Sequence, residues 1–287
     1  MSTTLRALAA AIWAGWYRDF GWINPLAGLF LRTIPPIASV LALVLIYGVA
    51  KPSASLDPNF GSQIAFLLVG GALYAHIAAY SWVATLAVAE GKWTYVFQSV
   101  YISPKSATPY LAGRTIASFI TSATTSIIAL TVGFFVAGAL FPANQIPFNI
   151  TFVTVPLFVL ALVVNIFASM GLGFLLGAYS IYSTKFEWAL PTYISGVLMI
   201  FSEALFPTSI LPAPLRDFAN ILPFTNFIRA SRQALLPPPL YGSMSLYLSD
   251  LGLCFLGGIV FLAVGLGAFR LAENHGRRKG VLDRKAV

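Results

Sequence analysis

Very few side chains in this sequence could carry out chemistry. The chain has two histidines, His76 and His275, and one cysteine, Cys254. Two distant histidines give neither a metal cluster nor a catalytic dyad, and a single cysteine forms no internal disulfide. The phosphate-binding pattern G-x-x-x-x-G-K-[ST] is missing, so we do not expect nucleotide binding of the usual kind. The chain is therefore predicted to have no catalytic residue, metal or bound cofactor, and not to be an enzyme by itself.

One carboxylate lies in an otherwise apolar stretch. Glu203 comes just before the helix-breaking pair Phe206–Pro207, and an acid at membrane depth is costly unless it is paired or faces water. Arg229 and Arg232, on the following proline-rich segment, are plausible partners. The pair either holds that segment in place or forms a gate or substrate contact. We favour the structural role, because one carboxylate offers little selectivity.

Some polar and aromatic side chains could line a path through the protein. His76, Tyr80 and Tyr193 are the residues that we select. Each has a simpler interpretation, because a buried histidine commonly hydrogen-bonds a neighbouring helix and an aromatic ring at these positions can face lipid. For His76 we favour the interhelical hydrogen bond, and for the two tyrosines both interpretations stay open.

The composition places these residues in a membrane protein. Of 287 residues, 58% are hydrophobic and 9% are charged, with a mean hydropathy of +0.83. No charged residue occurs between Arg114 and Lys185, a gap longer than a soluble core helix needs. The net charge of +8 does not indicate nucleic acid, because the basic residues cluster at the ends of apolar runs. We expect one all-α integral membrane domain over residues 1–287.

Apolar runs and helical periodicity predict the elements of this domain. Residues 1–22 form an amphipathic helix in the membrane interface, and Trp13, Trp16, Arg18 and Asp19 interrupt the apolar core that a cleavable signal would need. Pro35 and Pro36 are placed in the opening turn of the first span. Six spanning helices are predicted at 34–50, 61–89, 115–140, 150–179, 188–206 and 251–269.

The distribution of lysine and arginine predicts the orientation. With six spans and a cytoplasmic N-terminus, thirteen of the 17 basic residues fall on the cytoplasmic side. The other four, Lys51, Arg216, Arg229 and Arg232, fall outside. This asymmetry is the positive-inside pattern, so both termini, including the basic tail 272–287, are expected in the cytoplasm.

The cytoplasmic loop 90–112 combines aromatic residues with helical spacing. Trp93, Val96, Phe97, Val100 and Tyr101 recur on one helical face, and Pro104 then ends the helix. Such a short helix either lies on the membrane or docks into a groove of a soluble partner.

Two sets of residues resemble one family. Glu90, Gly91, Thr94, Ser103 and Pro104 resemble the coupling loop of the membrane subunits of type-2 ATP-binding-cassette (ABC) exporters. Pro207, Ser209, Leu211 and Pro212, followed by Leu222, Pro223, Phe227 and Arg232, resemble the external segment of these subunits between spans five and six. The resemblance extends from the N-terminal helix to the sixth span, and the order and placement of the motifs carry it.

The resemblance implies a fold for the proline-rich segment 207–239. Residues 213–222 and 224–235 are each too short to cross a membrane as a helix. Joined at Pro223, they would form a re-entrant helical hairpin that caps the outward end of a translocation path. The alternative is a loop that lies on the outer leaflet.

The resemblance also implies a function. The chain would be the permease subunit of an exporter in the cytoplasmic membrane of a bacterium or archaeon, moving an amphipathic drug, lipid, glycolipid or polysaccharide outward. It would pair with a second copy or a homologous permease, and separate ABC subunits would bind ATP and Mg. The coupling residues would be Glu90, Trp93, Thr94, Phe97, Tyr101 and Pro104, and the gate residues Glu203, Pro207, Pro212, Pro223, Phe227 and Arg232.

Two other functions remain as alternatives. A membrane scaffold or assembly protein could use the same fold without transport. An ion-coupled carrier is less favoured, because the spans lack ion pairs that would relay protons or sodium.

Overall fold

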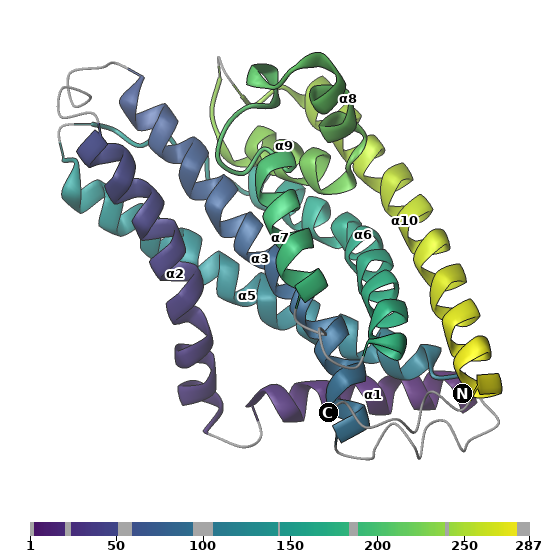
Figure 1. The fold of residues 1–287 in the computed structure, drawn as a ribbon. Helices are drawn as coiled ribbons and strands as arrows, with labels where there is room; N and C mark the ends of the chain where they lie inside the picture. The colour runs from purple at the N-terminus through teal and green to yellow at the C-terminus, as the bar shows by residue number, and fades with distance from the viewer. Residues whose placement is uncertain are drawn as a thin grey trace.

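The computed structural model describes residues 3–20, 24–50, 59–93, 106–142, 144–183, 189–238 and 241–279. Across these ranges the chain is all-α, with one short 3-10 helix, η2 (Thr208–Ile210), and no strand. Figure 1 shows a bundle of long helices with one helix lying across its lower end and two short helices at its upper end.

Five described helices are long and apolar enough to cross a membrane. They are α2 (Pro25–Ala50), α3 (Phe60–Trp93), α5 (Thr108–Leu140), α6 (Thr154–Tyr182) and α10 (Met244–Lys279). Each exceeds the roughly 20 residues that span the hydrocarbon layer. The chain is therefore a multi-pass membrane protein, and four of these helices correspond closely to predicted spans.

The fifth predicted span differs from the structure. Instead of a helix over 188–206, α7 (Ala189–Phe201) has 13 residues and is about 20 Å long, too short to cross by itself. The chain then bends through Ser202 and Glu203, and Glu203 has a φ of 63°. This left-handed residue and the following Phe206–Pro207 end the helix earlier than its apolar composition indicates.

The placement of Pro35 and Pro36 in an opening turn is wrong. Helix α2 begins ten residues earlier than Pro35, at Pro25, so both prolines lie inside it. They remove the N–H groups that would bond the carbonyls of Leu31 and Arg32. The apolar residues before the prolines continue the helix despite this loss, and Ser39 donates a hydrogen bond to the carbonyl of Pro35 at 2.9 Å.

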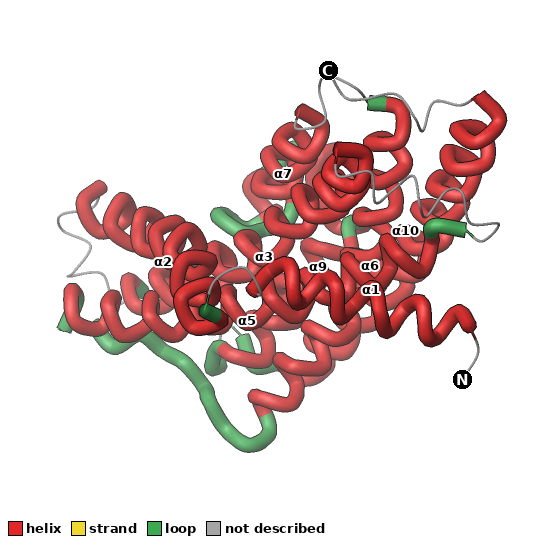
Figure 2. Tube along the Cα trace, turned by 90° about the horizontal axis from the view of Figure 1, so that it is seen from below, coloured by secondary structure: helices red, strands yellow, loops and turns green. Residues whose placement is uncertain are grey.

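Helix α1 (Thr3–Phe20) crosses the lower end of the bundle (Figures 1 and 2). Ala11 and Phe20 are buried toward the bundle, whereas Trp13, Trp16 and Tyr17 are exposed. An exposed aromatic face on a helix that lies across the end of the bundle is the arrangement that an interfacial helix requires. The predicted N-terminal helix is thus observed.

Helices α6 and α10 pack side by side at very close range. A Cβ atom added at Gly171 would collide with the backbone of Phe261 and Leu262, and one at Gly265 would collide with the backbone of Gly171. Only glycine permits this approach, as is common between membrane helices. These two helices support the upper hairpin, because α9 (Pro223–Leu235) packs against both.

Candidate functional site

At the upper end of the bundle, the proline-rich segment folds as a helical hairpin. Helix α8 (Ala213–Ile221) and helix α9 meet at Leu222 and Pro223, as predicted. Helix α9 is buried almost throughout, including Phe227 and Ile228, whereas Arg216 and Asp217 on α8 are exposed. Pro207 and Pro212 precede η2 and α8 and are exposed. The hairpin therefore has an inner helix within the protein and an outer helix on its surface.

The predicted pairing of Glu203 is present. Arg229 donates from Nε to Glu203 Oε2 at 2.5 Å, and Nη1 of Arg232 lies 3.6 Å from Oε1. Thr208 also donates to Glu203 Oε2, at 3.2 Å. Arg229 further contacts Thr208 and donates to Asn220 Oδ1 at 2.8 Å. Glu203 and its partner Arg229 thus connect four segments, which are the bend that follows α7, the helix η2, and the helices α8 and α9.

Arg232 is the most deeply buried charged residue in this cluster. Its side chain has no exposed surface, and Nη2 donates to the carbonyls of Phe66 and Ala204 at 3.1 and 3.2 Å. Its guanidinium lies over the Phe66 ring, 3.3 Å from the centroid, a cation–π arrangement. Gly70 makes room for it, because a Cβ there would collide with Ala204 and Arg232. The inner helix is therefore fixed to α3.

A cavity of about 540 Å³ lies beside this cluster. Its walls come from α2, the start of α3, the bend before η2 and the residue Tyr241 that precedes α10. Aromatic and amide side chains contribute to the lining, including Tyr47, Asn59, Gln63, Phe66, Phe206 and Tyr241. The size is within the usual range for ligand pockets.

The three predicted path residues do not meet in this cavity. His76 is fully buried, with Nδ1 2.8 Å from Ser122 Oγ and its ring edge-on to Tyr80 and Phe119. Tyr80 is also buried and donates to the carbonyl of Thr115 at 3.3 Å. Tyr193 is 73% exposed on α7. Two of them form a packed interhelical cluster, and the third faces outward.

At the opposite end, the predicted coupling loop is anchored at its start. Glu90, near the end of α3, forms an ion pair with Arg18 of α1. The other residues predicted to form the coupling surface, Thr94, Phe97, Tyr101 and Pro104, lie outside the described residues, and so does the Trp93 side chain.

The end of the same loop is anchored by Glu273. Its Oε2 accepts a hydrogen bond from Ser106 Oγ at 2.7 Å, and its Oε1 accepts from the backbone N–H of Ala107 at 2.8 Å. Arg277, one turn later on α10, donates to the same Oε1 at 2.9 Å. Glu273 is 2% exposed, and it supplies the acceptor that the start of α5 needs. The loop between α3 and α5 is thus held at its start by Arg18 of α1 and at its end by Glu273 of α10.

Comparisons with known proteins give no family. No protein-family model matches the chain, and a search of curated proteins finds no match. What the geometry establishes is a helical membrane protein with five candidate spans among the described residues. Its two polar clusters, around Glu203 and around Glu273, lie at opposite ends of the bundle (Figure 1).

Sequence reasoning missed Glu273 and Asp19. Glu273 was assigned to a cytoplasmic tail, although its position four residues before Arg277 is typical of a helical ion pair. Asp19 accepts from Arg32 at 2.9 Å and is 6% exposed. An acid at the end of an interfacial helix, followed by a lone arginine before an apolar run, was the available signal.

Proposed function

We propose that this chain is the membrane-spanning permease subunit of an ABC exporter of the type-2 class. In this proposal a separate subunit hydrolyses ATP, and an amphipathic drug, lipid, glycolipid or polysaccharide moves outward through a pair of permease chains. Arg18–Glu90 and Glu273 hold the two ends of a coupling loop, and α8 and α9 cap the outward end of the path.

The observation that carries the proposal is the contrast between the two ends of one helical bundle. One end has a two-helix hairpin too short to cross, fixed by the Glu203 cluster. The other has an interfacial helix and a loop anchored on both sides. In a transporter, ATP hydrolysis at one end of the bundle must open a path at the other end. Such coupling needs an anchored element at each end, and rigid helices between them.

The first test asks whether an ATPase binds the loop. We predict that the tagged full chain, purified from its native host, carries an ATP-binding subunit with a phosphate-binding loop. Replacing Trp93, Phe97 and Tyr101 together by alanine should reduce that subunit by at least about tenfold, because aromatic anchors at interfaces are commonly worth about 2 kcal/mol or more. Quantitative mass spectrometry of the purified material measures the ratio.

A matched control tests whether the loss of the ATPase is specific to the aromatic residues of the loop. A triple alanine variant of the exposed α10 residues Leu248, Leu256 and Val260 should retain the ATPase. If the native chain carries no ATP-binding subunit, the exporter proposal fails and the scaffold alternative is favoured. If the ATPase stays on the aromatic variant, the exporter proposal stands but the loop is not its docking site.

A further inference from the structure

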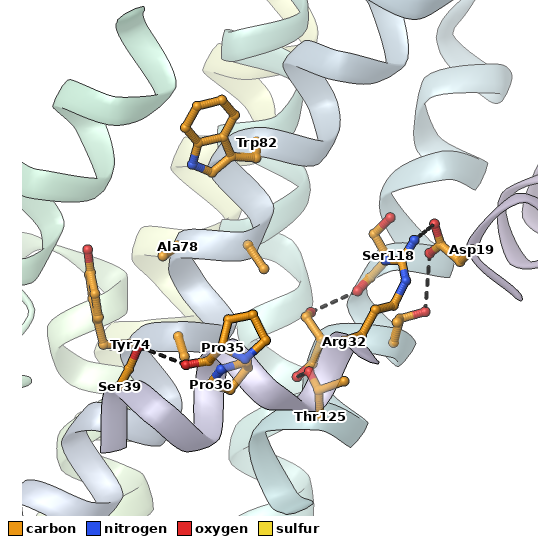
Figure 3. Close-up of a pocket in the computed structure, with 14 residues that line it drawn as sticks. Asp19, Arg32, Pro35, Pro36, Ser39, Tyr74, Ala78, Trp82, Ser118 and Thr125 are labelled. Atoms are coloured by element: carbon orange, nitrogen blue, oxygen red, sulfur yellow. Dashed lines mark hydrogen bonds and ion pairs between the residues drawn. The ribbon is translucent and has the colours of Figure 1, made fainter. Parts of the chain in front are cut away.

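A second cavity lies at the α1 end of the bundle, away from the hairpin. It has a volume of about 330 Å³ and lies between α2, α3 and α5 (Figure 3). Helix α3 lines it with Ala75, Ala78 and Ala79, whose small side chains leave the space. Pro35, Ser39 and Trp82 in the wall are exposed, so the cavity reaches the surface of the bundle.

One edge of the cavity carries a guanidinium with unused donors. Arg32 donates from Nη2 to Asp19 Oδ1 at 2.9 Å, and its side chain is 41% exposed. Asp19 is engaged on both oxygens, because Thr121 donates to its Oδ2 at 3.3 Å. A guanidinium has five N–H donors, and this one makes a single hydrogen bond within the described part of the chain. Asp19 thus orients Arg32 and leaves most of its donors available.

The surrounding charges favour an anion. The region where α1 meets α2, α3 and α5 contains three arginines, Arg18, Arg32 and Arg114, and two carboxylates, Glu90 and Asp19. Arg114 is 6% exposed and donates to the carbonyl of Gly15 at 3.3 Å, with no carboxylate partner among the described residues. Burial lowers the pKa of the Arg18 guanidinium, and the positive charge of Arg114 lowers it further. Among the described residues of this region, arginines therefore outnumber carboxylates by three to two.

The remaining walls are suited to an amphiphile. Thr125 donates its hydroxyl proton to the carbonyl of Ser122 at 3.0 Å, so its oxygen can accept a hydrogen bond from a ligand. Trp82, Pro35 and Pro36 supply apolar surface on the other side (Figure 3). A water-soluble anion would not use this apolar side.

We propose that the cavity binds the headgroup of an anionic phospholipid, with the phosphate on Arg32 and the first part of the acyl chains against Trp82 and the two prolines. With the predicted orientation this lipid belongs to the cytoplasmic leaflet, at the depth of α1. The volume accommodates a headgroup, and the chains leave through the exposed side. The site does not depend on transport, because it needs only a membrane that contains the lipid.

The test is lipid binding to the delipidated full chain, followed by native mass spectrometry during titration with dioleoyl phosphatidylglycerol. Arg32→Ala should weaken binding by at least about tenfold, since a charge-assisted hydrogen bond is commonly worth that much. Arg32→Lys should fall between, because an ammonium cannot contact Asp19 and a phosphate in the same bidentate way. Dioleoyl phosphatidylcholine, whose ammonium balances its phosphate, should bind more weakly than phosphatidylglycerol.

A second variant separates binding from folding. Ala78→Phe fills the cavity and leaves the Arg32–Asp19 pair intact, and it should also weaken phosphatidylglycerol binding. Arg278→Ala, which removes an exposed arginine at the end of α10, should have no such effect. Unchanged binding in both cavity variants, equal loss in Arg278→Ala, or equal affinity for both lipids would overturn the proposal. Competition by inorganic phosphate at the lipid's own concentration would also overturn it, by assigning the site to a soluble anion.

Discussion

Glu203 shows how one residue can determine the geometry of a whole segment. Its positive φ ends α7, and its carboxylate contacts two arginines of the returning helix. Arg232 is without exposed surface, so removal of Glu203 leaves a buried cation without its counterion. A broken buried pair of this kind costs about 3–5 kcal/mol, more than either charge contributes on the surface.

The burial of Arg232 beside Glu203 leads to the first prediction at the residue scale. Glu203→Ala should lower the free energy of unfolding by about 3 kcal/mol, and Arg229→Ala should lower it less, because Arg232 still faces the carboxylate. The double variant should be less destabilised than the sum of the two by about 1 kcal/mol or more. Denaturant unfolding of the purified protein in detergent measures all three values, with exposed Arg216→Ala as the control. Strict additivity would show that the residues do not act as a pair.

Glu273 permits a second prediction about a single residue. Glu273→Ala removes the acceptor for Ser106 and Ala107 and should reduce transport per ATP hydrolysed, because the loop end is no longer held by α10. Glu273→Gln keeps an acceptor for the Ala107 N–H and should restore much of this ratio. Arg277→Ala, which leaves both loop contacts in place, is the matched control.

The measurement is substrate transport and ATP hydrolysis in the same proteoliposomes, which contain the chain together with the ATPase subunit that we propose as its partner. A purely structural role would lower both activities in proportion to the amount of folded protein. An unchanged transport-to-hydrolysis ratio in Glu273→Ala would therefore contradict a coupling role.

At the scale of elements, apolar length predicted the long helices well and their ends poorly. The hydrophobic runs that became α3, α5, α6 and α10 are long enough to be unambiguous, but α5 begins before its predicted span, α6 begins after it, and α10 extends beyond it at both ends. Helix α10 continues to Lys279 because Glu273 and Arg277 form contacts that hydropathy does not register. Local apolarity also favoured a span over 188–206, where a left-handed glutamate ends the helix instead.

The hairpin was predictable for a different reason. Pro212 is the N-cap residue of α8, and Pro214 and Pro223 lie in the first turns of α8 and α9, where the missing N–H of proline costs least. The family resemblance, together with these proline positions, predicted two short helices that meet at Pro223, and α8 and α9 are those helices. The sequence did not reveal which of the two is buried, because that depends on contacts with α3, α6 and α10 that are distant along the chain.

At the scale of the whole molecule, the bundle separates two sets of anchored elements. Helix α1 and the loop anchors lie at one end, and the hairpin lies at the other (Figure 1). Helix α3 runs between them, from the cavity beside the hairpin to Glu90. It is thus the element through which a displacement of the loop would reach the Arg232 contact at Phe66. We therefore propose that the hairpin moves when the loop is displaced.

The most direct measurement of that claim is thiol accessibility of the hairpin from outside the cell. With the buried Cys254 replaced by serine, single cysteines at positions 216, 217, 222 and 227 are treated with a membrane-impermeant reagent. We predict fast labelling at 216 and 217, and slow labelling at 222 and 227, whose present side chains are at most 7% exposed. Trapping the ATPase subunit that we propose as the partner in its closed state should raise labelling at 222 and 227. Fast labelling at all four positions, or labelling at 222 and 227 that ignores nucleotide, would contradict a gate at this end of the bundle.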